Sequence, residues 1–353
     1  MNSKPLNTTN EWKLFFKKKG VSNDVIEKYL EYIYPLLSNK VPIIFEFDHL
    51  SLLLGRQIDY LASVINSPDN HYTSFNLLKR TGGSREITIP YPALLEMQYW
   101  IYNNILKKIS IDSSAHGFAK KKSIITNAKV HIGQEEILKL DLKDFFPSIN
   151  INRIIHIFKS LGYSNHISFY LASICSYNKS LPQGSPTSPQ ISNIVAKKLD
   201  KRLISLSKKL NLKYTRYADD LTFSGKHISV KTIEYITEII IDEGFEVNKH
   251  KTRLYKKPGK RIITGVSVKK DSINIPSTYK RNLKQELYYI FKYGYESHIS
   301  KKKIKKYNYL LSLIGKVNYW LSIEPDNHYA INAKIELEKI YSSIYFSNKK
   351  RDA

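Results

Sequence analysis

Apolar and polar residues alternate in several short segments, as is typical of β-strands. Residues 84–90 (SREITIP) follow a Gly-Gly turn signal, and residues 136–146 (EILKLDLKDFF) begin with the same alternation. Residues 212–224 (LKYTRYADDLTFS) alternate on both sides of a central turn, which predicts a β-hairpin. Two further short strands are predicted around residues 245–247 and 262–268.

Other segments have the periodicity of amphipathic helices. Residues 91–109 place apolar side chains at helical spacing after Pro92. Residues 185–210 begin with proline-rich turn signals and continue as an amphipathic helix from residue 192, and residues 230–243 form another. Residues 279–313 are rich in Lys and Tyr and give no strand signal, so we expect a small helical unit there. The order strand, helix, hairpin, helix, strand predicts an α+β fold with an antiparallel sheet.

The charge of the chain indicates a polyanionic partner. Its 353 residues include 56 Lys and Arg against 31 Asp and Glu, a formal net charge of +25. An AT-rich genome would also enrich lysine, but it would enrich glutamate too and so does not explain the imbalance. We therefore expect the chain to bind nucleic acid.

Cysteine content and hydropathy narrow the class of protein further. Cys175 is the only cysteine, which excludes an internal disulfide and a multi-cysteine zinc site, and its apolar neighbours suggest a buried thiol. The first twenty residues lack the apolar stretch of a signal peptide. No run approaches the roughly 18 apolar residues of a membrane span. We expect a soluble cytoplasmic protein with no membrane partner.

Adjacent aspartates at the centre of the predicted hairpin are the sharpest chemical feature. Asp219 and Asp220 each disfavour the ionised form of the other, and a bound divalent cation would remove that penalty. Paired aspartates are also common in ordinary turns. Asp141 ends a separate apolar strand, and a third carboxylate there would complete a site for two Mg²⁺ ions.

Seven segments in order along the chain resemble the motifs of reverse transcriptases, and more narrowly of bacterial retron reverse transcriptases. They are RTGGSREITIP, AHGFAKKKSIITNAKVH, LKLDLKDFFPSI, LPQGSPTSPQISN, YADDLTFSG, GFEVNKHKTRL and RIITGVSV, within residues 75–268. The segment LLSLIGKVNYWL resembles the thumb of the same enzymes and extends the likeness to about residue 321.

Two short motifs favour the retron branch. Asn127 and His131 match the Asn-Ala-x-x-His pattern of retron enzymes, and Thr264 and Gly265 follow Ile263 where that family usually has Val-Thr-Gly. The resemblance implies that these four residues bind RNA. From the residues alone, Asn127 and His131 are better explained as a capping or surface pair one helical turn apart.

The resemblance implies a right-hand polymerase architecture with fingers, palm and helical thumb. We predict an N-terminal helical extension over residues 1–48 and fingers and palm over residues 49–268. Within the latter, the palm covers about residues 136–150 and 186–268. A helical, RNA-binding thumb is predicted over residues 269–353.

Matched position by position, the resemblance also implies a catalytic centre. Asp141, Asp219 and Asp220 match the metal-binding triad, assisted by the backbone carbonyl of Leu142. Lys251 matches the general acid that protonates the departing pyrophosphate. Its neighbours Lys249, His250 and Arg253 leave that assignment open by a residue or two.

A binding site for the incoming dNTP is implied beside this centre. Phe146 matches the aromatic gate that excludes a 2′-hydroxyl, although without the motif an ordinary core phenylalanine would be the better interpretation. Gln183 and Gly184 match the loop that packs against the nucleotide. The other residues implied for this site are Lys79, Arg85, Asp144 and Phe145.

The implied partners are a cognate non-coding RNA and its DNA product. The RNA would serve as template and, through the 2′-hydroxyl of an internal guanosine, as primer, giving a branched RNA–DNA molecule. A host ribonuclease H would remove the template, and an effector protein would join in anti-phage defence. Thumb cations expected to hold the RNA are Lys280, Arg281, Lys284, Lys301, Lys302 and Lys303.

Three other functions are compatible with part of this motif pattern. A group II intron or diversity-generating reverse transcriptase shares most motifs, although the former usually carries further domains. A viral RNA polymerase would more often have Gly-Asp-Asp at the hairpin. A non-catalytic RNA-binding module would need neither the three aspartates nor Gln183 and Phe146.

Overall fold

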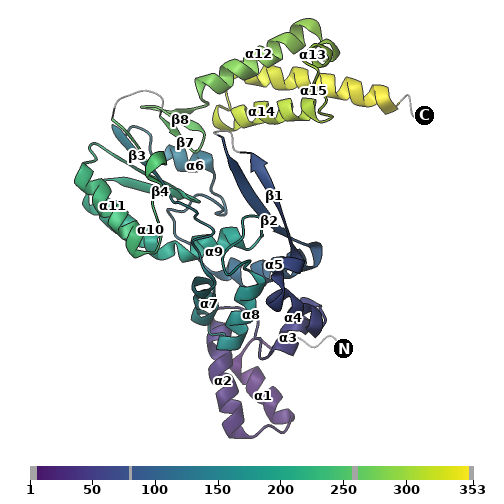
Figure 1. The fold of residues 1–353 in the computed structure, drawn as a ribbon, viewed down its shortest axis with the longest axis vertical. Coiled ribbons are helices and arrows are strands. Elements are labelled where there is room, and N and C mark those ends of the chain that lie inside the picture. The colour runs from purple at the N-terminus through teal and green to yellow at the C-terminus, as the bar shows by residue number, and fades with distance from the viewer. Residues whose placement is uncertain (1–5, 79–81, 257–260, 350–353) are drawn as a thin grey trace.

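A computed structural model describes residues 6–78, 82–256 and 261–349, with side chains described as far as residue 344 (Figure 1). The chain begins with a helical hairpin at one end of the molecule, and a bundle of four helices lies at the other end. Between them are a long β-hairpin and a four-stranded sheet flanked by helices. The fold is α+β and has the right-hand polymerase architecture expected from the sequence.

Helices build the first part of the chain, and they pack beneath the long β-hairpin. The Thr8 side chain caps the first helix and forms a capping box with Glu11, which explains why the helix begins there. The elements are α1 (Thr9–Lys18), α2 (Asn23–Ser38), α3 (Phe47–Leu54), α4 (Ile58–Asn66), β1 (Tyr72–Leu78), β2 (Ser84–Pro90), α5 (Pro92–Asn104) and α6 (Ile124–Lys129).

The central sheet has the strand order β4-β5-β3-β6 and is antiparallel throughout. Helices α10 and α11 lie beside the sheet, and α7, α8 and α9 lie below it in Figure 1. The elements are β3 (Glu136–Asp141), α7 (Ile151–Ser160), α8 (Asn165–Ile174), α9 (Ser188–Val195), α10 (Lys197–Lys209), β4 (Lys213–Tyr217), β5 (Asp220–Gly225), α11 (Val230–Asp242) and β6 (Arg253–Tyr255).

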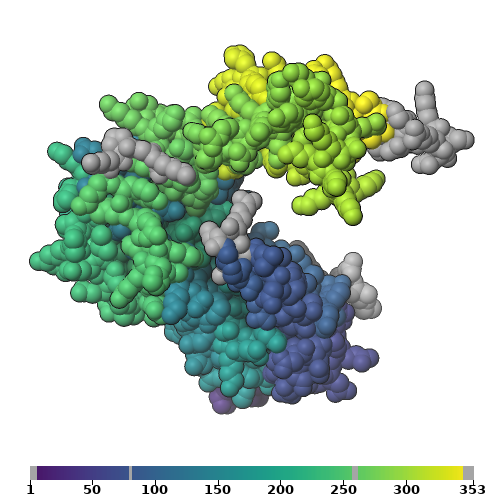
Figure 2. Space-filling view, turned by 45° about the horizontal axis from the view of Figure 1, so that its top comes forward, coloured from purple at the N-terminus to yellow at the C-terminus, as the bar shows by residue number. Residues whose placement is uncertain are grey.

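The last part of the chain is a small sheet followed by the helical bundle. Figure 2 shows a hollow between this bundle and the β1–β2 hairpin. The elements are β7 (Ile262–Ile263), β8 (Val266–Val268), β9 (Ile273–Asn274), α12 (Ser277–Tyr293), α13 (Tyr295–Lys302), α14 (Tyr309–Ile323) and α15 (His328–Lys349).

Among the residues that the structure describes, buried apolar side chains form three clusters. The largest includes residues from Leu36 to Val247 and is formed by the central sheet together with the helices that pack against it. A second joins Ala128 and Ile137 to β7–β9 and to the helical bundle, so it crosses the domain boundary predicted at residue 268. A third holds the N-terminal hairpin together.

Three predicted elements differ in the structure, and one of them is the strand expected around residues 262–268, which is two strands, β7 and β8, joined by a turn. The single helix expected over residues 192–210 is divided between two helices, α9 and α10, which meet at Ala196, and α9 begins earlier than expected. The strand expected at residues 245–247 is absent; only an isolated bridge joins Leu142 and Val247, and the fourth strand is β6 instead. Among the described residues, no helix is long and apolar enough to cross a membrane.

Candidate active site

Strand register brings the predicted acidic residues to one end of the central sheet. Asp141 is the last residue of β3 and pairs directly with Asp220, the first residue of β5. Asp219 lies in the turn between β4 and β5, and its carbonyl accepts a 2.9 Å hydrogen bond from the backbone N–H of Leu142. The turn is tight, with Ala218 in the left-handed region at φ 55°. The three aspartates, distant in sequence, are thus neighbours.

A buried arginine supports this turn from below. The Arg216 guanidinium donates to the carbonyl of Ala218 at 3.2 Å and to Oδ1 of Asn193 at 3.0 Å. It also donates to both oxygens of Asp200, and both side chains are fully buried. A buried charge persists only when paired and hydrogen-bonded, and these contacts join the guanidinium to the turn that carries Asp219 and to the helices beneath it.

A loop at residues 116–118 packs against the other side of the turn. The His116 N–H donates to the Arg216 carbonyl at 2.7 Å, and Asn193 Nδ2 donates to the Gly117 carbonyl at 3.0 Å. A Cβ on Gly117 would lie 2.5 Å from the backbone nitrogen of Ala218. Only glycine allows so close an approach without displacing the turn.

The carboxylates of the three aspartates lie close together in a partly buried site. Burial, followed by the charges of Asp220 and Asp141, raises the pKa of Asp219 to about 6. The pKa of Asp220 is also raised, chiefly by burial. A bound cation would relieve both costs.

A lysine partly offsets this charge. Lys251 Nζ lies 2.8 Å and 2.9 Å from the two oxygens of Asp141, and this contact raises the lysine pKa. In the part of the chain that the structure describes, no three His, Cys, Asp or Glu side chains are already arranged to hold a metal ion. The donors are nevertheless the hard carboxylate oxygens that divalent cations prefer, so the residues fit such an ion once Lys251 releases Asp141.

A cavity of about 570 Å³ adjoins Asp141 and Asp219 and contains most of the residues predicted to bind a nucleotide. Its walls come from β2, from the segment after β3, and from the loop before α9. The predicted site residues along it are Arg85, Asp141, Leu142, Asp144, Phe145, Phe146, Gln183, Asp219 and Lys251. Asp220 faces a smaller neighbouring cavity that shares Asp141 and Lys251. Lys79 lies outside the described residues.

Comparisons with known proteins agree with this geometry. Residues 78–286 match the family model described as "Reverse transcriptase (RNA-dependent DNA polymerase)". The retron Ec86 reverse transcriptase of Escherichia coli is 32% identical over 321 residues, covering 89% of this chain and 97% of that protein. The retron Ec73 reverse transcriptase of the same species is 30% identical and covers 78% and 90%, respectively. The retron Mx162 reverse transcriptase of Myxococcus xanthus is 36% identical over 56% of this chain and 47% of its own.

The chain belongs to the bacterial retron reverse transcriptases. It is therefore an RNA-directed DNA polymerase, a family that generally uses divalent metal ions.

In this reverse transcriptase, the residues predicted to bind the nucleotide differ in their burial and in the contacts that fix them. Phe146 is half-buried at the cavity wall, whereas Phe145 is only 2% exposed and packs on Phe245. Gln183 accepts a 2.8 Å hydrogen bond at its carbonyl from the Thr88 N–H. Gly184 has φ 139°, and a Cβ there would lie 2.5 Å from the Thr88 carbonyl oxygen. The loop is thus fixed to β2 by its backbone.

Asn127 and His131, predicted to bind RNA, are buried in this structure and contact other parts of the chain. Both side chains are 0% exposed. His131 lies between Ser224 Oγ at 2.6 Å and Thr215 Oγ1 at 2.8 Å, on strands β5 and β4. Asn127 Nδ2 donates to Thr264 Oγ1 at 3.3 Å. The pair therefore joins α6 to the central sheet and to the β7–β8 turn, and it is not a surface pair either.

Thr264 and Gly265 form that β7–β8 turn, between palm and thumb. Both have positive φ, at 45° and 85°. The Gly265 carbonyl accepts a 3.3 Å hydrogen bond from Tyr319 on α14, and Gly265 itself is exposed. The turn thus reaches the surface beside the C-terminal half of α14.

The predicted thumb cations divide into two groups. Lys280 pairs with Glu324 at 2.7 Å, and Lys284 lies 4.5 Å from the centre of the Tyr329 ring, so both contribute to packing within the bundle. Lys284 is nevertheless exposed, as are the remaining four, Arg281, Lys301, Lys302 and Lys303.

Sequence reasoning missed the residues that support the catalytic turn. Arg216 offered a usable signal as a charged residue in a predicted strand, because unpaired charges are rarely buried, whereas Asp200 lies among lysines and arginine and offered none. Asn193 and Gly117 gave no comparable signal, since their role depends on contacts between distant segments.

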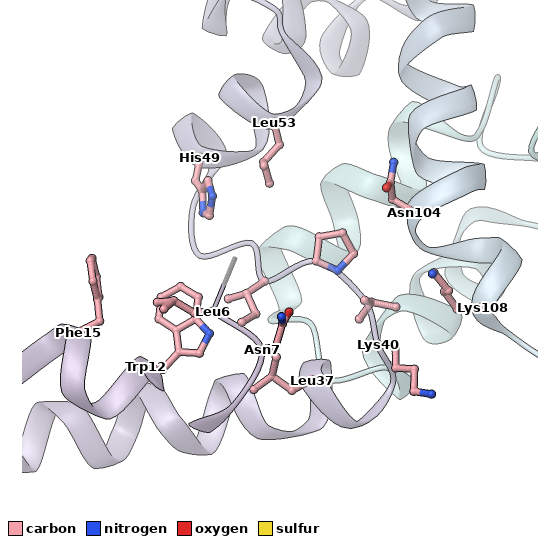
Figure 3. Close-up of a pocket in the computed structure, with 13 residues that line it drawn as sticks. Leu6, Asn7, Trp12, Phe15, Leu37, Lys40, His49, Leu53, Asn104 and Lys108 are labelled. Atoms are coloured by element: carbon pink, nitrogen blue, oxygen red, sulfur yellow. The ribbon is translucent and has the colours of Figure 1, made fainter. Parts of the chain in front are cut away.

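A larger cavity, of about 940 Å³, lies away from the aspartates, where the N-terminal hairpin meets α3 and α5 (Figure 3). Trp12 and Leu37 line it from the hairpin, and His49 and Leu53 line it from α3. It has no carboxylate among its lining residues, so the acid chemistry described above does not extend to it.

Proposed function

We propose that this reverse transcriptase copies a cognate structured non-coding RNA into a branched RNA–DNA molecule, multicopy single-stranded DNA. The observation that carries the proposal is the register of β3 against β5, which sets Asp141 opposite Asp220 beside the Asp219 turn. The named retron relatives and the net charge of +25 support an RNA partner.

We assign the metal site to Asp141, Asp219 and Asp220, with the Leu142 carbonyl as a further ligand, and we expect two Mg²⁺ ions. Bound there, the ions would lower the pKa of the primer hydroxyl and neutralise the triphosphate. The raised pKa values of Asp219 and Asp220 support this assignment, because burial, followed by the neighbouring carboxylates, disfavours their charged forms and a bound cation would offset that cost.

The chain's own side chains would supply positioning and proton transfer. Lys251, protonated beside Asp141, is placed to donate its proton to the leaving pyrophosphate. Phe146 would lie under the sugar and exclude a 2′-hydroxyl. Arg85, with Lys79, would bind the triphosphate, while Gln183, Gly184 and the segment containing Asp144 and Phe145 would enclose the nucleotide.

The RNA would lie in the hollow between the helical bundle and β1–β2 (Figure 2), held by exposed cations. Arg281, Lys301, Lys302 and Lys303 would contact its phosphates, and the Thr264–Gly265 turn would meet it at the palm edge. Priming from an internal 2′-hydroxyl, template removal by a host ribonuclease H, an effector partner, cytoplasmic location and a role in anti-phage defence complete the proposal by analogy with the family.

The test combines a double variant with an analysis of bound nucleic acid. Asp219→Asn with Asp220→Asn should abolish dNTP incorporation and leave RNA affinity within about threefold, because the thumb cations are untouched. The wild-type protein should co-purify with a branched RNA–DNA molecule. Continued DNA synthesis by the double variant would refute the metal assignment, and an unbranched product would refute the proposed priming.

A further inference from the structure

Phe118 is an exposed aromatic residue that lines the active-site cavity and has no role in the site described so far. Its side chain is 48% exposed, although the nearby Phe145 and Phe245 are buried. Its ring centre lies 6.2 Å from that of Phe146, at an interplanar angle of 57°. Asp141, Asp219 and Gln183 line the same cavity.

The backbone of Phe118 is also unfavourable. It has φ 57°, in the left-handed region that bulky side chains rarely adopt. Such conformations persist where the surrounding structure determines them, and they are concentrated at functional sites. Here the fold maintains a strained backbone while leaving an apolar ring half in solvent, so neither local preference nor burial explains the residue.

The segment that holds Phe118 is fixed to the catalytic turn. Gly117, the preceding residue, packs against Ala218, and its carbonyl is held by Asn193. His116 donates to the Arg216 carbonyl. The ring therefore has a defined place relative to Asp219, as a residue that positions a substrate requires.

We propose that Phe118 packs against the nascent base pair, formed by the incoming dNTP and the templating RNA base. The proposal rests on the nucleotide site assigned above. Arg85 and the aspartates supply the charged contacts of this cavity, and Phe146 supplies a wall for the sugar. An exposed ring suits the remaining apolar part of the substrate, the bases, because every base has a face on which an aromatic ring can stack.

A contact of this kind should act on nucleotide binding and should not distinguish the four bases. We expect Phe118→Ala to raise the KM for each of the four dNTPs by about tenfold, with kcat within about threefold. Phe118→Tyr keeps the ring and should restore the wild-type KM. Affinity for the RNA should stay unchanged in both variants.

The Phe118→Gly variant distinguishes a role in positioning the substrate from a role in stabilising the fold. Glycine accepts positive φ, so this variant should melt at the same temperature as the wild type or higher while its KM rises as in Phe118→Ala. Phe169, 43% exposed on α8 outside the cavity, provides the control, and Phe169→Ala should leave the KM unchanged.

Three results would overturn the proposal. An unchanged KM in an active, folded Phe118→Ala enzyme would remove the contact. Weaker discrimination against rNTPs with an unchanged dNTP KM would show that Phe118 only supports Phe146. A lower melting temperature in Phe118→Gly would show that the ring serves the fold. Failure of the polymerase proposal itself would differ, because the wild-type enzyme would then make no DNA on the RNA template.

Discussion

Arg216 Nε and Nη2 donate to the two carboxylate oxygens of Asp200, at 2.8 Å and 2.6 Å, and neither side chain is exposed. The same guanidinium holds the carbonyl of Ala218, so the ion pair is continuous with the turn that carries Asp219. The position of the turn proposed to be catalytic therefore depends on a charge pair in the interior.

Asp200→Asn should destabilise the protein by about 3–5 kcal/mol, because it leaves a buried guanidinium without its counter-charge. The free energy of unfolding in urea measures this. Arg202 and Asp242 form a matched exposed pair at 2.8 Å. Asp242→Asn should cost no more than about 1 kcal/mol. Equal costs for the two substitutions would contradict the importance given to burial.

Gly117→Ala should reduce DNA synthesis by at least tenfold, because the added Cβ would lie 2.5 Å from the Ala218 nitrogen and push on the catalytic turn. RNA affinity, measured by filter binding, should not change. Gly315 in α14 is the control, since a Cβ there meets nothing within 4 Å. Gly315→Ala should retain activity and gain up to about 1 kcal/mol of stability. Full activity in Gly117→Ala would show that the turn tolerates displacement.

Phe146→Val should weaken the discrimination between dNTPs and rNTPs, because a smaller side chain leaves room for a 2′-hydroxyl at the cavity wall. We expect the ratio of kcat/KM for dNTP over rNTP to fall by at least tenfold, mainly through better use of rNTPs. Single-nucleotide incorporation on one RNA template measures both. A ratio that stays at the wild-type value would remove Phe146 as the gate.

His131 should make the stability of the protein depend on pH below neutrality. Burial lowers its pKa from 6.5 to about 3, so the folded protein keeps the ring neutral while the unfolded chain takes up a proton below pH 6.5. Stability from this residue is therefore present above pH 6.5 and is lost as the pH falls, by about 2 kcal/mol at pH 5.

Urea unfolding of His131→Gln at pH 7.5 and pH 5 provides the measurement. The variant should be less stable than the wild type at pH 7.5 and should lose less stability on acidification. His166 on α8 is exposed, and His166→Gln should keep the wild-type pH dependence. If His131→Gln keeps it too, the ring is not the titrating group.

The sequence predicted best those elements whose signal is local. The β4–β5 hairpin shows in the alternation around residues 217–220, and Asp141 ends β3 as expected because an apolar strand precedes it. The alternation of apolar and polar residues at 245–247 has another cause. Phe245 is buried against Phe145 and lies 4.5 Å from the Arg153 guanidinium, so packing of a loop imitates a strand pattern.

Contacts between distant segments could not be predicted in this way. Asn127 and His131 have the spacing of an exposed helical pair, but their partners Thr264 and Thr215 lie far along the chain. Burial of these two side chains therefore follows from tertiary packing alone. The position of Phe118 is a similar case, because the two residues before it are held by hydrogen bonds to distant parts of the chain. The His116 N–H donates to the Arg216 carbonyl, and the Gly117 carbonyl accepts from Asn193.

The apolar cluster shared by palm and thumb limits how this enzyme can open. Ile137 of β3 and Leu313 of α14 belong to the same cluster. Swinging the thumb away about residue 268 would bring both into water, at a cost of about 1.5–3 kcal/mol for each large side chain uncovered. The bundle thus resists displacement from the central sheet, so the side of the hollow that it forms is held in place by core packing.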